Sequence, residues 1–305
     1  MKVIEVSNVI KKFGDFTAVN NVSFDVSPDR IFGIIGPNGA GKTTTIRMIT
    51  NILIPDSGTI KVFGKDTNYT LQNIIGYLPE ERGLYKKLKV IDQLIYFGQL
   101  KGMEYKKAKE KARQWLDRLD AQNWADMKIQ ELSKGMQQKV QFISTILHEP
   151  KLLILDEPFS GFDPINTELM KSIILDLKKS GSSIILSTHI MEQAEQMCDE
   201  ICLINKGNIL LSGAIRDIKA DYNRDTVILE FDGPSDFLNE LGGLKIINKT
   251  NNRVEFRFNP NELDTKKILN TVMKFANVYK FEMKEPSLHE IFIDVVSKSE
   301  GDKNE

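Results

Sequence analysis

Most of the chain alternates between short, continuous apolar runs and longer segments with a helical spacing of apolar residues. The clearest runs are residues 30–35, 152–155 and 183–187, each bounded by polar or glycine-containing stretches. Continuous apolar runs of this length are typical of parallel strands that are buried on both faces. Segments with helical spacing follow, at about residues 44–53 and 167–179. This order predicts an α/β fold built around a buried sheet.

Two other regions contain shorter strand-like runs. Residues 1–29 contain such runs at Val3–Val6 and Val19–Val26, with a turn at residues 13–15 between them. Residues 58–79 contain two or three more, followed by a polar loop at residues 79–83. Alternation and turn residues of this kind indicate a second set of strands outside the buried sheet.

The segment from Val90 to about Leu119 is helical in pattern and heavily charged. Its simplest interpretation is a solvated helix face that carries charge pairs four positions apart. A basic patch for nucleic acid is the less favoured interpretation, because acidic residues are interspersed. A further helical run follows Ser133, a residue type that commonly caps helices, and stops before Pro150.

The pattern changes after Gly213. Strands are predicted at residues 226–231, 244–249, 253–258 and 278–283, with a short helix near Phe237 and a longer one over residues 263–275. The order β-α-β-β-α-β favours a separate ferredoxin-like module. We therefore expect an α+β accessory domain at residues 222–297, which includes a last helix at residues 288–296, and a disordered tail at residues 298–305. This module contains no catalytic constellation of its own.

Residues 34–46, IIGPNGAGKTTTI, match the phosphate-binding pattern G-x-x-x-x-G-K-[ST]. Glycines allow the backbone to aim its N–H groups inward, and the N-terminus of the following helix adds partial positive charge. Lys42 would reach the β- and γ-phosphates, and the Thr43 hydroxyl would bind Mg²⁺. The alternative is an accidental glycine turn. A buried strand before the motif and a helix after it argue against that alternative.

Other candidate residues follow the buried strands or lie on turns. Asp156 and Glu157 end the run at residues 152–155, at the edge where open α/β sheets bind ligands. The first carboxylate suits Mg²⁺ and the second suits a base that activates water. His189 follows another strand, where a single histidine is more often structural than catalytic. Phe13 on its turn is either a half-buried hairpin residue or a platform on which a nucleobase stacks.

Composition limits the classes of protein that fit. The chain has 305 residues, of which 41% are hydrophobic, and a formal net charge of -1, so its balance favours neither nucleic acid nor an acidic surface as a partner. Cys198 and Cys202 are interpreted as buried free thiols. We find no signal peptide and no apolar run of the ~18 residues that span a bilayer. If the protein works at a membrane, a partner must supply the spanning part.

Five segments resemble, in the correct order, the motifs of ABC-type ATP-binding cassettes. They are GPNGAGKT for the Walker A loop, LSKGM for the signature motif, LLILDEP for the Walker B strand, SGFD for the D-loop and Ser187-Thr188-His189 for the H-switch. The resemblance covers about residues 1–215. It implies a P-loop NTPase cassette with a RecA-like core, an antiparallel β lobe and a helical subdomain at about residues 85–150. It also implies ATP and Mg²⁺ as cofactors.

The resemblance also implies a role for each matching residue. It assigns nucleotide binding to Phe13, Gly36, Asn38, Gly39, Gly41, Lys42, Thr43 and Thr44, and to Ser133 and Gly135 of the opposite subunit. It assigns metal binding to Thr43, Asp156 and Glu80, and catalysis to Lys42, Glu157 and His189. In this family Glu157 would polarise the attacking water and His189 would sense the γ-phosphate. Asp163 would communicate across a dimer.

Three residues depart from the family pattern. Glu80 stands where the family usually has Gln, Lys134 where the signature has Gly, and Met136 where it has Gln. By family geometry, Glu80 and the partner's signature loop meet at one composite site. We hypothesise that Lys134 screens or pairs with Glu80 only when the dimer is closed. The alternative is that both side chains point to water.

The segments after Glu80 (GLY) and at residues 285–292 (EPSLHEIF) resemble one subgroup, the bacterial ATP-binding subunits of drug, sodium and polysaccharide-type exporters. This implies an ATPase that dimerises, as a homodimer or with a similar cassette, and powers an integral-membrane permease. Its place would be the cytoplasm, peripheral on the inner face of the cell membrane, with no nucleic acid as partner. The alternative is a soluble ABC ATPase acting on nucleic acid or the ribosome. Such relatives generally carry two cassettes or long coiled-coil insertions, which this chain lacks.

Overall fold

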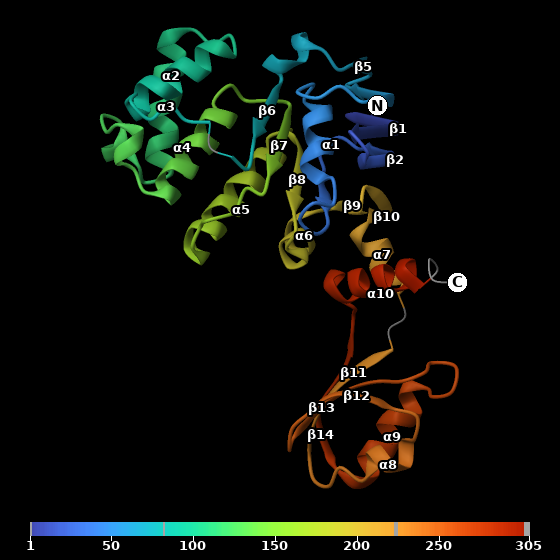
Figure 1. Cartoon of the computed structure of the whole chain (residues 1–305). Coiled ribbons are helices and arrows are strands. Elements are labelled where there is room, and N and C mark those ends of the chain that lie inside the picture. Colours follow the sequence, from blue (N-terminus) through green and yellow to red (C-terminus); the bar gives the residue numbers. More distant parts are fainter. Residues whose placement is uncertain (1, 82, 223–224, 302–305) are drawn as a thin grey trace. The chain divides into compact units, whose positions relative to one another are not determined.

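The structure of the chain, a computed structural model, describes residues 2–81, 83–222 and 225–301 (Figure 1). Its contacts divide the chain into two compact units. The first contains Met1–Ile215 together with the residues from Lys298 onward, and the second contains Arg216–Ser297. Each unit has its own sheets and its own apolar core, so each is described by itself.

A six-stranded sheet forms the centre of the first unit. Its strands, in spatial order, are β10 (Asn208–Ala214), β9 (Glu200–Asn205), β3 (Ile31–Ile35), β8 (Ser183–Thr188), β7 (Leu152–Asp156) and β6 (Ile75–Leu78). All neighbours pair in parallel except β9 and β10, and every residue of β3, β7 and β8 is buried. The three continuous apolar runs are therefore fully buried parallel strands, as their sequences predict.

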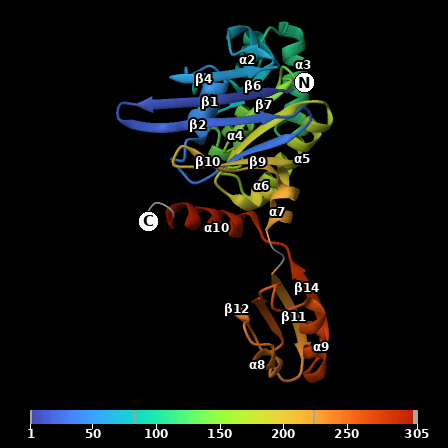
Figure 2. The same cartoon turned by 90° about the vertical axis from the view of Figure 1, so that its right-hand side faces the viewer.

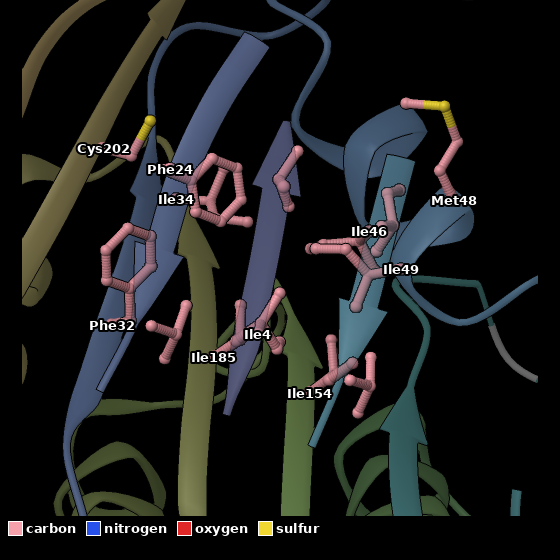
Figure 3. Packing of buried hydrophobic residues seen from close by; sticks show 14 of the residues in the cluster. Ile4, Phe24, Phe32, Ile34, Ile46, Met48, Ile49, Ile154, Ile185 and Cys202 are labelled. Atoms are coloured by element: carbon pink, nitrogen blue, oxygen red, sulfur yellow. The ribbon is translucent and has the colours of Figure 1, made fainter. Parts of the chain in front are cut away.

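A second, antiparallel sheet belongs to the same unit. It is formed by β2 (Phe16–Val26), β1 (Ile4–Phe13), β4 (Ser57–Val62) and β5 (Lys65–Asp66), in that order, and Figure 2 shows β1 and β2 side by side. One apolar cluster joins both sheets and helix α1 (Lys42–Ile49). Figure 3 shows Phe24 of β2, Phe32 of β3 and Ile46 of α1 among its members. Burial of these side chains fixes α1, and thus the loop before it, against both sheets.

Helices cover the remaining surfaces of this unit. They are α2 (Val90–Leu100), α3 (Tyr105–Arg118), α4 (Lys134–Ile146), α5 (Pro164–Lys179) and α6 (Met191–Met197), with short 3₁₀ helices at Tyr69–Asn73, Gln122–Trp124 and Ile129–Glu131. Helix α7 (Ile215–Asp221) begins at the boundary and belongs, from Arg216 onward, to the second unit. α2, α3 and α4 pack on one another, α4 also contacts β6, and α6 packs on β3 and β8. The helix predicted after the glycine loop begins at Lys42 instead of Thr44 and ends at Ile49 instead of Leu53.

The charged segment predicted as one helical stretch, residues 90–119, is divided into α2 and α3. Gly102 lies between them with a φ of +84°, a conformation that glycine adopts without steric cost. The amide of Gly102 donates to the carbonyl of Gln99, which closes the end of α2. The break allows two helices to bury apolar faces where one straight helix would extend into solvent.

The second unit has the predicted ferredoxin-like topology. Its elements follow in the order β11 (Thr226–Asp232), α8 (Phe237–Leu241), β12 (Lys245–Lys249), β13 (Arg253–Arg257), α9 (Thr265–Phe275) and β14 (Asn277–Lys284). The sheet is antiparallel with the spatial order β12-β13-β11-β14, and its buried residues form a separate core. β12 is an edge strand whose residues are all exposed, and its pairing with β13 shifts register between Ile246 and Asn248.

The expected end of the chain is wrong in part. The last helix, α10, runs over Leu288–Gly301, so residues 298–301 are helical and not a disordered tail. Ser287 begins this helix, because its backbone N–H and its hydroxyl both donate to Glu290 Oε2, at 2.8 and 2.9 Å. Once capped, the helix continues through the polar sequence. Residues 302–305 lie outside the described residues.

Over residues 2–81, 83–222 and 225–301, no helix is both long and apolar enough to cross a membrane.

Candidate nucleotide site

The loop between β3 and α1 is held tightly against its surroundings at two glycines. A Cβ atom at Gly36 (φ +149°) would lie 2.0 Å from the carbonyl oxygen of Ile204, and one at Gly41 (φ +109°) would lie 2.5 Å from that of Ala18. Neither position admits a side chain without moving the backbone. The loop therefore passes close to neighbouring backbone and leads directly into α1, whose N-terminus carries partial positive charge.

The Lys42 side chain is buried in this loop. Its ammonium donates a hydrogen bond to the carbonyl oxygen of Gly36 at 2.8 Å and lies 3.7 Å from Glu157 Oε1, while the side chain is 6% exposed. Burial lowers the pKa of Lys42, and three nearby carboxylates act in the opposite direction, namely those of Glu157, Asp156 and Glu80. A buried cation among backbone dipoles favours an anionic ligand such as a phosphate group.

Asp156 ends β7 directly opposite Ser187 of β8. The Ser187 hydroxyl donates a hydrogen bond to Asp156 Oδ1. Asp156 is fully buried, and its Oδ2 has no hydrogen-bond partner among the described residues. Because an unpaired buried carboxylate oxygen is costly, this atom fits a site that takes a hard cation or a water bound to one.

Mg²⁺ fits the residues present here. Thr43 lines the cleft together with Glu157, the residue that follows Asp156. Within the described parts of the chain, no group of three or more His, Cys, Asp or Glu residues could hold a metal alone. Mg²⁺ typically binds one or two protein oxygens together with phosphate oxygens and water. The donor set therefore fits a cation that binds together with a phosphate ligand.

Glu157 follows Asp156 in a left-handed backbone conformation, with a φ of +49°. Such a conformation costs a non-glycine residue about 1–3 kcal/mol, so surrounding contacts must hold it. The amide of Glu157 donates to the Ser187 carbonyl at 3.1 Å, which holds the turn. His189 Nδ1 donates to Glu157 Oε1 at 2.9 Å, since an ionised carboxylate can only accept. The sharp turn thus directs Glu157 toward both Lys42 and His189.

A cleft of about 490 Å³ lies at this edge of the sheet. Its lining residues come from the first hairpin, the glycine loop and the ends of β6 and β7: Phe13, Phe16, Ala18, Asn38, Gly39, Ala40, Gly41, Lys42, Thr43, Thr44, Glu80 and Glu157. Phe13 is 49% exposed, with the Lys11 ammonium 5.8 Å from its ring centre. The aromatic ring is therefore accessible to a flat ligand group, and the same cleft carries the cation and two carboxylates.

The structure does not bring every candidate residue to this cleft. Five predicted site residues are absent from its lining: Gly36, Asp156, His189, Ser133 and Gly135. Ser133 is exposed and caps α4, with its Oγ accepting from the Met136 amide at 3.3 Å. Lys134 is exposed and forms no ion pair with another residue that the structure describes. Asp163 caps α5 by accepting from the Asn166 amide at 2.9 Å.

The sequence does not identify two residues of the site, Ser187 and Phe16. Ser187 belongs to the H-switch motif, but its hydroxyl also donates to the Asp156 carboxylate and its carbonyl accepts from the Glu157 amide. Phe16 lines the cleft beside Phe13. The aromatic pair on one tight turn was visible in the sequence and could have indicated Phe16. The pairing of Ser187 with Asp156 requires the strand order, which the sequence alone does not give.

Comparisons with known proteins agree with this geometry. Residues 19–160 match a family model described as ABC transporter, and residues 213–296 match one described as the C-terminal domain of DrrA1-3-like ATP-binding proteins. The chain is 44% identical to the ABC transporter ATP-binding protein YhaQ of Bacillus subtilis (strain 168), covering 96% of this chain and 98% of the relative.

A relative with a named transport role is also similar. The Nod factor export ATP-binding protein I of Burkholderia lata is 34% identical over 78% of this chain and 80% of its own length. Among solved structures, an ATP-binding subunit of an ABC transporter superposes with a TM-score of 0.67 at 29% identity, covering 72% of this chain and 92% of that subunit. The predicted cassette fold is confirmed.

We expect Ser187→Ala to lower the free energy of unfolding of the first unit by about 1–3 kcal/mol, because it removes the hydrogen bond to a fully buried carboxylate. Both tryptophans, Trp115 and Trp124, belong to this unit, so their fluorescence in a urea titration reports its unfolding. The matched control is Ser183→Ala on the same strand, whose hydroxyl only accepts from the Asp29 amide at 3.2 Å. Equal losses for the two variants would contradict the role given to Ser187.

Proposed function

The chain belongs to the family of ABC transporter ATP-binding proteins, which hydrolyse ATP for transport, and on that premise we propose that it powers a separate integral-membrane permease for export. The observation that carries this proposal is the contact of Glu157 with both Lys42 and His189, at a cleft that Lys42 and Glu157 line. Export is supported by a relative that is named for it. The protein would act as a peripheral subunit on the cytoplasmic face of the membrane, with its ATPase chemistry in residues 1–215.

We assign each step of hydrolysis to a residue that lines the cleft or lies next to one that does. Lys42 would neutralise the β- and γ-phosphates from within the glycine loop, and Phe13 would stack on the adenine. Glu157 would polarise the attacking water while His189 holds its carboxylate through the 2.9 Å hydrogen bond. Asp156 and Thr43 would hold Mg²⁺, which neutralises phosphate charge when bound. Catalysis in this scheme is positioning and electrostatic stabilisation of the transferred phosphoryl group.

A second subunit completes the site in this proposal. Ser133 and Gly135 lie outside the cleft and on the surface side of α4, so they are free to reach a nucleotide bound to another copy. Asp163, which caps α5, would be at the same junction. The partner is an identical chain or a similar cassette. The alternative function, a soluble ATPase acting on nucleic acid or the ribosome, is not supported by relatives named for transport.

The variant Glu157→Gln tests the catalytic assignment. It keeps the shape of the side chain but removes the charge that polarises water, so we expect ATP to bind, hydrolysis to fall by about a hundredfold or more and a closed dimer to accumulate. Sizing chromatography with ATP and phosphate release measure the two effects. Lys42→Ala is the control, because it should lose nucleotide affinity and stay monomeric. A Glu157→Gln protein that hydrolyses at the native rate contradicts the assignment.

Co-purification from detergent-solubilised membranes tests the transporter proposal. With an affinity tag on the full chain, we expect an integral-membrane protein to be recovered in a defined ratio to it. The untagged chain in the same preparation is the control for nonspecific recovery. Recovery of ribosomes or DNA instead would favour the alternative function and overturn the proposed one.

A double-mutant cycle tests whether Glu80 and Lys134 compensate for each other across the dimer. If they meet in the closed state, Glu80→Gln and Lys134→Gly should show a coupling of about 0.5–3 kcal/mol in ATP-dependent dimerisation. Glu81 offers a matched control, because it is the adjacent carboxylate but lines a different cavity. The cycle of Glu81→Gln with Lys134→Gly should be additive. Additivity in both cycles would mean that Glu80 and Lys134 point to water.

A further inference from the structure

The loop after β6 borders two separate hollows of the first unit. Glu80 lines the nucleotide cleft, whereas its neighbour Glu81 lines a larger cavity of about 790 Å³. Gln141 of α4, His148 just after α4 and Lys101 at the end of α2 also line this cavity. A contact that holds this loop therefore also determines the position of Glu80 in the nucleotide cleft.

The side chain of Gln141 makes that attachment. Its Nε2 donates hydrogen bonds to the carbonyl oxygens of Pro79 at 3.4 Å and Glu81 at 3.1 Å, the residues on either side of Glu80. The reverse orientation of the amide would point its oxygen at two carbonyl oxygens, so these contacts determine which atom faces the loop. The amide thus holds the carbonyl groups of the two residues that flank Glu80.

Packing alone does not account for a glutamine at this position. Gln141 is only 4% exposed and lies in α4 between Val140 and Phe142, which are both fully buried. Its Oε1 has no hydrogen-bond partner among the described residues. Burying an amide with one atom unpaired is unfavourable compared with burying an apolar side chain of similar size. The two hydrogen bonds to the loop are what the amide provides and an apolar side chain would not.

We propose that Gln141 is a positioning residue for ATP hydrolysis, which holds Glu80 in the nucleotide cleft and ties it to α4. The inference relies on the proposed nucleotide role of Glu80, but not on the permease. α4 begins at Lys134, next to the Ser133 cap, and Gln141 follows seven positions later, about 10 Å along a rigid helix. A displacement of the Ser133 end of α4 is therefore passed to the loop of Glu80.

The position of the Glu80 carboxylate affects the electrostatic environment of Lys42. The Glu80 carboxylate is one of the three that raise the pKa of Lys42 against the effect of burial. Glu80 is exposed and no described side chain holds it with an ion pair, so its backbone is what determines its position. Moving the loop therefore changes the electrostatic environment of the cation that faces the phosphates.

Single-turnover hydrolysis by the full chain tests the proposal. Gln141→Leu removes both hydrogen bonds to the loop at nearly constant volume, and we expect the hydrolysis rate to fall about tenfold, as for other residues that orient a site, while the ATP affinity stays unchanged. The matched control is Thr145→Val, also on α4 and lining the same cavity, whose hydroxyl donates only to the Gln141 carbonyl of the helix. It should leave the rate unchanged.

The same pair of measurements in a Glu80→Ala background distinguishes positioning from general destabilisation. If Gln141 acts through Glu80, Gln141→Leu should cause no further loss once Glu80 is truncated. An equal loss in both backgrounds, or no loss in the native one, would overturn the proposal. Should Gln141→Leu fail to fold by circular dichroism, Gln141→Met, which is unbranched and lacks the donor, replaces it. Failure of co-purification with a permease would leave these outcomes unaffected.

Discussion

The first unit is built around one buried positive charge, the ammonium of Lys42. Its surroundings supply backbone carbonyl oxygens from the loop and carboxylates from the ends of neighbouring strands, because a cation cannot be buried without such partners. The parallel register of β3, β7 and β8 delivers these groups to one edge of the sheet. Three features accompany this concentration of charged groups: glycines where the loop meets neighbouring backbone, the left-handed turn at Glu157, and the Ser187 hydroxyl that binds Asp156.

Local sequence was sufficient for much of this arrangement. The run at residues 152–155 is apolar throughout and the run at residues 183–187 is apolar between two serines, and that pattern alone predicts buried parallel strands ending in functional residues. The spacing of Gly36, Gly41 and Lys42 identifies the phosphate loop without knowledge of the fold. The order of strands and helices after Gly213 likewise predicts the ferredoxin-like topology that is observed. In each case the evidence for the prediction is the pattern of one short segment or the order in which such segments follow one another.

What could not be predicted depends on residues far apart in the chain. Ser187 meets Asp156 only because β7 and β8 are neighbours, and Gln141 meets the loop of Glu80 only because α4 packs against β6. The sequence of α4 suggested a helix, but a glutamine among apolar residues gave no sign of its partner. The helix break at Gly102 is a compromise between local helical preference and burial, which local preference alone does not reveal.

The edge strand of the second unit has a consequence for the protein's behaviour at high concentration. β12 has one side that does not pair with another strand of the sheet. Its exposed isoleucines, Ile246 and Ile247, are typical of edge segments that aggregate by adding strands from other molecules. Lysines at both ends, Lys245 and Lys249, and the register shift next to β13 interrupt a flat edge. Charge repulsion and a local kink both oppose the addition of a strand from another molecule. The sequence and the register shift of β12 therefore both oppose pairing of this edge with another molecule.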